Sequence, residues 1–295
     1  MLPINHLLCL VPNGGLDTAA WREAVHLARL TGATLHLASP DGARPEAVRA
    51  AVQEATGPEA TPALHVAHFP SDPNALADAV EQYARREAID LVVTDTPSDR
   101  GPVPPLAAAP VQSLLRRLDC SVLVVGHDTP LCRLRRLLVP TDLSASSTEA
   151  FEHAAALAAH ADAAIDLLHV IESDPYVALT RMDRLALSET SFPERRARRQ
   201  LTSFLDAHSA PEVPVESHFA YGEPADRIGR FVNRHEVDLM VLSAQSGPSS
   251  PKAPLGSVAD RVLRRVTCPV LLVRPPSPRD AGASLPSDAP DAPLV

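Results

Sequence analysis

Two short segments of small and polar residues could line a ligand site. The first is Pro140-Thr141-Asp142-Leu143-Ser144, at the end of one apolar run. The second runs from Ser243, at the end of another apolar run, to Gly256-Ser257 at the start of a helical stretch. An open α/β sheet binds ligands at the carboxyl ends of its strands, where the strand order reverses. If both runs are strands of such a sheet, these segments converge there, and the chemistry they suit is recognition of a small molecule.

Motifs for catalytic chemistry are missing from the chain. No GxxxxGK[ST] string and no GxSxG elbow occurs, so neither phosphoryl transfer nor a hydrolase triad has support. His153 and His160 lie on one expected helix, but no HExxH or similar ligand set surrounds them. His169 and His218 lie in strand-like runs, where paired structural histidines are favoured over catalytic bases. Enzymatic activity is therefore the weaker hypothesis, and neither a catalytic residue nor a metal site is predicted.

The second half of the chain alternates between short β-rich runs and longer helical stretches. The strand candidates are 135–140, 164–170, 213–219, 238–243 and 269–273. The helical stretches are roughly 145–160, 192–208, 224–235 and 256–265. The first helical stretch has one apolar face at three–four spacing, made of Ala150, Phe151, Ala154, Leu157 and Ala158. Ser144 or Ser146 would be its N-cap, and Pro224 suits the first turn of a later helix.

The chain contains a duplication. Residues 88–125 align without a gap with residues 236–273, since Asp90 and Asp238 lie 148 positions apart, as do Cys120 and Cys268. The starts of the halves also match, with Leu10-Val11-Pro12 set against Leu138-Val139-Pro140. In that alignment the loop after the first strand is about two residues shorter in the first copy. The duplication predicts two copies of one domain.

The first copy repeats the order of elements. Its expected strands are near 6–11, 33–38, 63–69, 90–94 and 121–125. Its expected helices are near 17–30, 45–56, 73–87 and 108–118. Five strands that alternate with four helices imply right-handed βαβ crossovers. The predicted fold class is therefore α/β, with two tandem doubly wound five-stranded parallel sheets.

Three stretches carry a family resemblance: VPTDLSASSTEAFEHAAALA (139–158), YGEPADRIGRFVNRHEVDLMVLS (221–243) and PLGSVADRVLRRVTCPVLLVR (254–274). With them the chain resembles the universal stress protein family, over nearly its whole length and twice, more strongly in the second copy. The resemblance implies the strand order 3-2-1-4-5 and dimers that pair edge strands, a pairing that a tandem chain can make within itself. The expected domains are 1–126 and 134–274, joined by a linker at 127–133 and followed by a tail at 275–295. The tail is rich in Pro, Ala, Ser and Asp and is expected to be disordered.

The resemblance also implies a nucleotide site in the second copy. Nucleotide-binding members carry Gly-x-x-Gly, nine residues, and then Gly-Ser or Gly-Thr, because backbone without side chains can approach phosphates closely. The matching positions here are Ser243, Ser246, Gly256 and Ser257, so serines replace the two leading glycines. Asp142 matches the family's adenosine-contacting Asp, and Val170 matches the position whose backbone lies against the adenine. With ATP or AMP as the implied ligand, the expected site residues are Pro140, Thr141, Asp142, Val170, Ser243, Ala244, Ser246, Gly256, Ser257 and Val258.

The first copy has lost these features. By the offset of 148, its counterparts of the four motif positions are Asp95, Ser98, Ala108 and Ala109, followed directly by Pro110. Asp95 places a negative charge where phosphate would approach. The first loop carries Gly14 in place of the Asp. Nucleotide is therefore not expected in the first copy.

Each site feature of the second copy also has a structural interpretation. Gly256-Ser257 could be a loop and helix N-cap, and Asp142 could be a turn residue or a cap. The intervening loop holds three prolines, which remove donors, and Lys252 as its only cation. The arginines at 195, 196, 198 and 199 could receive an acidic partner or nucleic acid, but a solvated helix face is favoured.

Composition narrows the classes of function. The 295 residues suit about two domains, and 45% are hydrophobic but only 3% aromatic, as expected for cores of Leu, Val, Ile and Ala. A net charge of −9 argues against nucleic acid as a partner. No apolar run is long enough to span a membrane and no secretory signal is evident, so a soluble cytoplasmic protein is expected. The four cysteines, Cys9, Cys120, Cys132 and Cys268, are expected to be buried free thiols.

The leading hypothesis is a non-enzymatic stress-response protein that acts as a binding or regulatory module. The first copy would be structural and complete an intramolecular pseudo-dimer, while the second would hold ATP or AMP. One alternative is a slow ATP hydrolase or phosphotransfer protein, for which the sequence names no metal ligand and no residue to position water. Another is an interaction scaffold without a ligand, bound to a protein partner that the sequence does not identify.

Overall fold

The computed structural model of the chain describes residues 4–11, 18–39, 45–56, 62–70, 72–95, 109–126, 134–172, 192–208, 212–244 and 255–274. The expected linker at 127–133 and the expected tail at 275–295 lie outside these residues. So does the stretch 245–254, which includes Ser246.

The elements of the first half are β1 (His6–Leu10), α1 (Ala19–Thr31), β2 (Thr34–Ser39), α2 (Pro45–Thr56), β3 (Leu64–His68), α3 (Pro73–Arg86), β4 (Leu91–Asp95), α4 (Ala109–Arg117) and β5 (Ser121–Val125). Those of the second half are β6 (Arg136–Thr141), α5 (Ala145–Ala161), β7 (Ala164–Ile171), α7 (Phe192–His208), β8 (Val215–Tyr221), α8 (Pro224–Arg234), β9 (Leu239–Ser243), α9 (Ser257–Leu263) and β10 (Val270–Val273). Every predicted strand and helix is present, with ends that differ from the prediction by no more than two residues.

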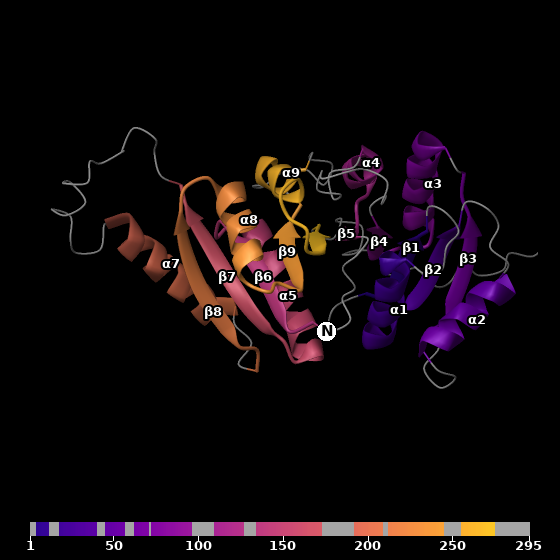
Figure 1. The fold of residues 1–295 in the computed structure, drawn as a ribbon, viewed down its shortest axis with the longest axis horizontal. Helices are drawn as coiled ribbons and strands as arrows, with labels where there is room; N and C mark the ends of the chain where they lie inside the picture. The colour runs from indigo at the N-terminus through magenta and orange to yellow at the C-terminus, as the bar shows by residue number, and fades with distance from the viewer. Residues whose placement is uncertain are drawn as a thin grey trace, which may run out of the picture.

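The strands form one sheet in the order β3-β2-β1-β4-β5-β10-β9-β6-β7-β8 (Figure 1). Within each half the strands are parallel and follow the order 3-2-1-4-5, which confirms the predicted fold class. The halves meet where β5 pairs with β10 in antiparallel orientation, with Val124 opposite Val270. This is the edge-strand pairing within one chain that the family resemblance implied.

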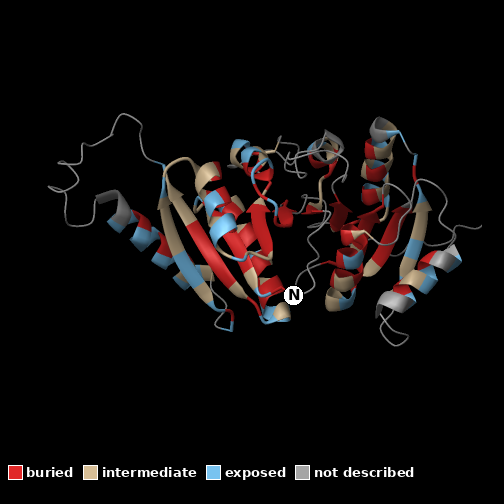
Figure 2. Cartoon of the chain, viewed as in Figure 1, coloured by how far each residue is buried: buried red, intermediate tan, exposed pale blue. Residues whose placement is uncertain are grey.

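Helices cover both faces of the sheet, and each face has its own apolar core. One core joins β1 and β2 to α1 and α2, and continues into α5 and α7 of the other half. The second core lies on the opposite face under α3, α4, α8 and α9. The central strands are buried, whereas the outer strands β3 and β8 are largely half-buried or exposed (Figure 2). Each core contains residues of both halves, so the halves are packed together on both faces of the sheet.

The junction between the halves is also tied by Arg274, which follows β10. Its backbone N–H donates to Ser121 Oγ at 3.2 Å, and its buried guanidinium donates to the carbonyl of Leu115. Burial lowers the pKa of Arg274, partly offset by Cys120 and Asp119. A side chain of the second half therefore satisfies a carbonyl at the end of a helix of the first.

Local signals in the sequence account for the helix ends. Ser144 is the N-cap of α5, since its hydroxyl accepts the N–H of Ser147 at 3.3 Å, which settles the choice between Ser144 and Ser146. Asp162 ends α5 in the left-handed region with a φ of 53°. Pro224 stands in the first turn of α8, as predicted. The five apolar residues predicted to form one face of α5 are all buried.

One part of the sequence-based alignment is wrong. Leu8 pairs with Val92 and Leu138 pairs with Met240. Since Val92 and Met240 lie 148 positions apart, the counterpart of Leu138 is Leu8, and the match of Leu10 with Leu138 is shifted by two. A shift of two keeps every side chain on the same face of a strand, so the apolar pattern could not reveal it.

The shift also overturns the expectation of a shorter first loop. The N-cap Thr18 follows Leu8 by ten positions, whereas the N-cap Ser144 follows Leu138 by only six. The loop after β1 is therefore the longer of the two, and the strand register does not set Gly14 against Asp142. Gly14 lies outside the described residues.

The cysteines and the arginine group largely follow the sequence analysis. Cys9 and Cys268 are buried, Cys120 is half-buried, and Cys132 lies outside the described residues. Burial raises the pKa of Cys268 and of Cys120 to about 12 each, so these two remain thiols at neutral pH. The arginines at 195, 196, 198 and 199 are exposed along α7, and the guanidinium of Arg198 lies over the ring of Phe219, 5.1 Å from its centroid. Among the described residues, no helix is long and apolar enough to cross a bilayer.

Candidate functional site

A cavity of about 300 Å³ opens in the second half, where β6, β7 and β9 end. β6 pairs with β7 on one side and with β9 on the other, so the strand order reverses at β6. The cavity is lined by residues from all three strands and from the starts of three helices: Pro140, Thr141, Asp142, Ser146, Ser147, Leu168, Val170, Glu172, Pro224, Ile228, Leu242, Ser243, Ser257, Val258 and Ala259. It stands at the edge of the sheet where the sequence analysis expects a ligand.

The loop after β6 is held in a fixed turn. Thr141 Oγ1 accepts the N–H of Leu143 at 3.0 Å and lies 2.9 Å from Ser147 Oγ. Leu143 itself has a φ of 64°, which a residue with a branched side chain rarely adopts. Strained backbone of this kind is common at binding sites, where the surrounding contacts maintain it. These contacts turn the chain sharply from β6 into α5 and leave the Asp142 side chain at the rim of the cavity.

Asp142 is ionised at neutral pH. Burial alone would raise its pKa, but hydrogen bonds from Ser144 and Ser147 outweigh it and hold the pKa below its usual value. The backbone N–H of Ser144 donates to Asp142 Oδ1 at 3.0 Å, so the proposed turn role of this carboxylate is realised. The same side chain lines the cavity, where a carboxylate with about four lone-pair positions can also accept hydrogen bonds from a ligand.

The floor of the cavity comes from β7. Leu168 and Val170 line it, and side chains alternate along a strand, so His169 lies on the opposite face. There its Nδ1 lies 2.9 Å from the carbonyl oxygen of Thr141, and its ring meets Phe219 edge to face. His169 is thus a paired structural histidine, as predicted, and takes no part in the cavity.

The far wall is built from α8 and α9. Glu223 caps α8 by accepting the N–H groups of Ala225 and Asp226. Its Oε1 also lies 2.8 Å from Arg261 Nη1, so an ion pair connects α8 with α9. By contrast, Gly256 at the start of α9 has no side chain to cap the helix, and its own N–H donates to the Ala244 carbonyl at 3.0 Å. The first turn of α9 borders the cavity through Ser257 and Val258.

Most of the residues predicted from the sequence gather at this cavity. Seven line it: Pro140, Thr141, Asp142, Val170, Ser243, Ser257 and Val258. Ala244 and Gly256 are not among the lining residues, but a hydrogen bond joins them directly behind it. Ser246 lies outside the described residues.

Sequence reasoning missed the wall that α8 contributes and the acidic residue at the end of β7. Pro224 and Ile228 reach the cavity because α8 crosses over β7, which no spacing in the sequence discloses. Glu172 could have been found, since it continues the alternation of Leu168 and Val170 on the same face. With Asp142 it makes two carboxylates in the lining, and the described lining holds no Lys or Arg.

The matching position in the first half differs in charge. Asp95 ends β4 opposite Val125, as Ser243 ends β9 opposite Val273. Asp95 is buried. The counterparts of Ser246, Gly256 and Ser257 in the first half are Ser98, Ala108 and Ala109. Ser98 and Ala108 lie outside the described residues, and Ala109 is the first residue of α4.

A larger hollow, of about 620 Å³, lies in the first half near the end of α1, around His26, Arg29, Gly32, Pro62 and Ala63. It sits at the amino ends of β2 and β3, on the other edge of the sheet from the expected ligand position. None of the predicted site residues reaches it.

Comparison with known proteins agrees with the architecture and with the family resemblance. Residues 133–274 match the model of the Universal stress protein family. A universal stress protein of Methanocaldococcus jannaschii is 28% identical over 144 residues, which cover 48% of this chain and 83% of that protein. Universal stress protein G of Salmonella typhimurium is 29% identical over 145 residues, which cover 48% of this chain and 99% of that protein.

Two solved structures share the fold over nearly the whole chain. A functionally unknown protein from Pseudomonas aeruginosa PAO1 aligns with a TM-score of 0.71 at 19% identity, covering 93% of this chain and 94% of that one. A universal stress protein from Archaeoglobus fulgidus aligns with a TM-score of 0.59 at 15% identity, covering 90% and 96%. These likenesses establish the fold of both halves. The match of residues 133–274 to the family model, together with the sequence relatives, shows that this half belongs to the universal stress protein family.

Proposed function

We propose that the second half is an adenine-nucleotide-binding module of a stress-response protein, with ATP or AMP as its ligand. The first half is its structural partner. The observation that carries the proposal is the convergence of residues from β6, β7, β9 and α9 on one cavity at the point where the strand order reverses. Its volume of about 300 Å³ lies at the lower end of the range of small-molecule sites.

The lining suits the adenosine part of a nucleotide. Leu168, Val170, Ile228 and Leu242 offer an apolar surface for a flat base. The ionised carboxylate of Asp142 is an acceptor for hydroxyl groups of a ribose. The family resemblance sets Asp142 against the adenosine and the backbone at Val170 against the adenine, so geometry and resemblance support the same orientation.

Phosphates would lie toward Ser243 and the first turn of α9. Two kinds of hydrogen-bond donor border this side of the cavity. They are the hydroxyls of Ser243 and Ser257 and the backbone N–H groups of Ser257 and Val258. With two carboxylates and no Lys or Arg in the described lining, each added phosphate contributes little affinity, and the adenosine part supplies most of it. The proposal therefore expects ATP and AMP to bind with similar strength.

The first half is proposed to bind no nucleotide. Asp95 stands where Ser243 stands in the second half and would place a carboxylate beside the phosphates. Its contribution is structural, through the two cores and the β5–β10 pairing that it shares with the second half. Binding at one site per chain follows from this division.

Calorimetric titration of AMP and of ATP with magnesium tests the proposal. The wild type is compared with Asp142→Asn, Gly256→Asp and the control Asp206→Asn, which changes an exposed carboxylate on α7 away from the cavity. We expect one site per chain and at least about tenfold weaker binding of both ligands in Asp142→Asn. In Gly256→Asp, which adds a carboxylate at the phosphate end, we expect weaker binding of ATP than of AMP. The control should bind as the wild type does.

Each alternative function has its own outcome in these experiments. No heat in the wild type at two temperatures, with no rise in melting temperature on addition of nucleotide, would favour a ligand-free scaffold. Single-turnover release of phosphate from bound ATP in the presence of magnesium would favour the hydrolase. Unchanged binding of both ligands in Asp142→Asn and in Gly256→Asp would place the nucleotide elsewhere on the chain.

A further inference from the structure

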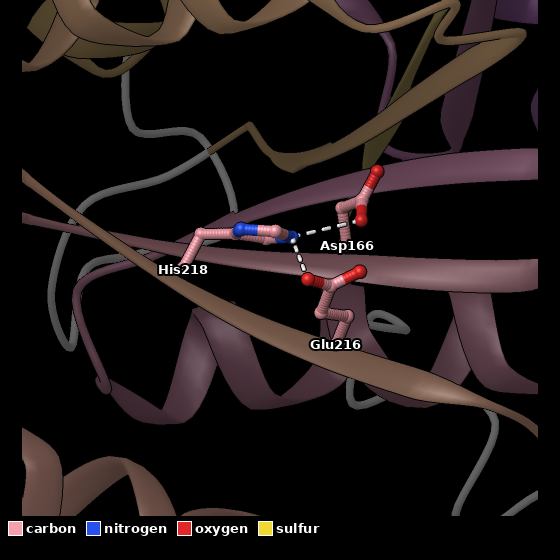
Figure 3. A group of neighbouring side chains, drawn as sticks. All are labelled: Asp166, Glu216 and His218. Atoms are coloured by element: carbon pink, nitrogen blue, oxygen red, sulfur yellow. Dashed lines mark hydrogen bonds and ion pairs between the residues drawn. The ribbon is translucent and has the colours of Figure 1, made fainter.

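Three potential metal ligands gather outside the cavity, on the two outermost strands of the second half. They are Asp166 on β7 and Glu216 and His218 on β8, drawn in Figure 3. One atom from each lies within 4.8 Å of the others. Asp166 pairs in register with Glu216, and Glu216 and His218 are two residues apart on one strand, so all three side chains point from the same face of the sheet.

The distances approach those of a coordination sphere. His218 Nε2 lies 2.9 Å from Asp166 Oδ1 and 3.9 Å from Glu216 Oε1. Ligands held about 2.1 Å from a tetrahedral zinc ion lie roughly 3.4 Å apart, midway between these two distances. In Figure 3 the imidazole nitrogen of His218 faces both carboxylates. An ion between the three atoms needs only small rotations, chiefly of Glu216, whose side chain is 69% exposed.

The surroundings hold two of the three ligands in place. The Asp166 side chain is only 3% exposed, and its Oδ2 lies 3.0 Å from Arg136 Nε, which leaves Oδ1 directed at His218. Oδ2 accepts no hydrogen bond from the described residues despite its burial. The His218 ring packs edge to face on Phe231. Ligands oriented by neighbours in this way lose little freedom when they bind an ion.

Exposure rises steadily across the cluster. The Asp166 side chain is 3% exposed, that of His218 is 20% exposed and that of Glu216 is 69% exposed. An ion could therefore enter from solvent past Glu216, and a water molecule could complete its coordination. Two carboxylates and one guanidinium also leave one negative charge in excess, which favours a cation over an anion.

The first half shows what the same positions contain when the carboxylates are absent. By strand register, His36 matches Asp166 and His65 matches Glu216, since His36 pairs with Leu8 and with His65. His36 Nε2 lies 3.1 Å from His6 Nδ1, and its Nδ1 lies 2.9 Å from the Tyr83 hydroxyl. Both nitrogens of the central ring are thus engaged within the first half. The two carboxylates are particular to the second half.

From this arrangement we infer that Asp166, Glu216 and His218 form a binding site for a divalent transition cation, with Zn²⁺ as the best match. One imidazole nitrogen and two carboxylate oxygens are ligands that zinc accepts. The site lies on the same sheet face as the cavity, since Asp166 precedes Leu168 by two positions, but none of the three ligands lines the cavity. It is therefore distinct from the proposed nucleotide site.

Titration of Zn²⁺ into the full chain, after removal of bound metal by a chelator, tests the inference. The wild type is compared with Glu216→Gln and His218→Gln, and with His65→Gln as the matched control from the first half. We expect one zinc ion per chain and at least roughly tenfold weaker binding in each ligand variant, with the control unchanged. Glu216→Gln changes a largely exposed side chain, so it keeps the test valid even if His218→Gln does not fold.

Two further measurements distinguish zinc bound at this site from zinc bound by other side chains, such as the cysteines. Co²⁺ bound by one nitrogen and two oxygens gives weak visible bands without the intense near-ultraviolet band of cobalt–thiolate bonds. Zinc should also raise the melting temperature of the wild type more than that of Glu216→Gln. Any of three results would overturn the inference: a cobalt–thiolate band, full zinc affinity in Glu216→Gln, or no zinc binding in the wild type. Unchanged zinc affinity in Asp142→Asn would confirm that the two sites are independent.

Discussion

Asp90 and Asp238 make the same pair of hydrogen bonds in the two halves of the chain. Asp90 Oδ2 accepts the N–H groups of Asn5 and His6 at 2.7 and 3.0 Å. Asp238 Oδ2 accepts those of Arg135 and Arg136 at 2.8 and 2.9 Å. In each half one carboxylate therefore anchors the start of the first strand beside the fourth, and the duplicated sequence has kept the contact.

Loss of either carboxylate should cost a similar amount of stability. Asp90→Ala and Asp238→Ala each leave two N–H groups without their acceptor, and we expect about 1–2 kcal/mol of destabilisation because water reaches part of each site. Denaturant unfolding measures the cost, with the exposed Asp206→Ala as the control. A loss of stability no larger than that of the control, at either position, would show that the contact does not anchor its strand.

Unfolding of the two halves should be coupled, because one apolar core contains both Trp21 of α1 and Phe151 of α5. Phe151→Ala should cost about 3–5 kcal/mol by leaving a cavity beside Phe204. Trp21 is the single tryptophan, so fluorescence follows the unfolding of its surroundings in the first half. We expect the fluorescence and circular dichroism transitions to shift together in Phe151→Ala and to stay in place in the exposed control Gln200→Ala. A tryptophan transition that does not move would mean that the halves unfold independently.

Acid should destabilise the protein through His36. Burial, with the nearby His65 and His6, lowers the pKa of His36 to about 4, against an opposing influence of Glu87. As pH falls below the ordinary histidine pKa of about 6.5, the unfolded chain gains a proton that the folded chain does not, so stability is lost between there and pH 4. Melting temperatures at pH 7 and pH 5 should differ by at least about 2 °C more in the wild type than in His36→Gln. His160→Gln, on the exposed side of α5, should retain the wild-type pH dependence.

The proposed orientation of nucleotide predicts different losses at the two ends of the cavity. Ser243→Asp introduces the carboxylate that Asp95 supplies in the first half, and it should weaken ATP binding more than adenosine binding. Asp142→Asn should weaken both ligands equally, by about tenfold or more, because both contain the ribose. Competition titrations with the two ligands measure the difference. Equal losses for ATP and adenosine in Ser243→Asp would reverse or exclude the proposed orientation.

The sequence by itself determined the elements and nearly half of the described cavity lining. Two helices and one strand begin and end at the predicted residues: Pro45–Thr56, Phe192–His208 and Ser121–Val125. Local periodicity carries this information, because a helix or strand is patterned by its own neighbours. Asp142 and Ser243 could be placed at one edge because the carboxyl ends of parallel strands meet there, whatever the side chains between them.

Only the tertiary structure decided which distant residues touch. Strand register decides that Leu138 corresponds to Leu8 and that Asp166 meets His218. Helix crossing decides that Ile228 of α8 reaches the cavity over β7. A two-residue change of register preserves the apolar pattern of a strand, so the pattern cannot select between such registers. Asp166 and His218 are separated by 52 positions, and the pairing of β7 with β8 is what makes them neighbours.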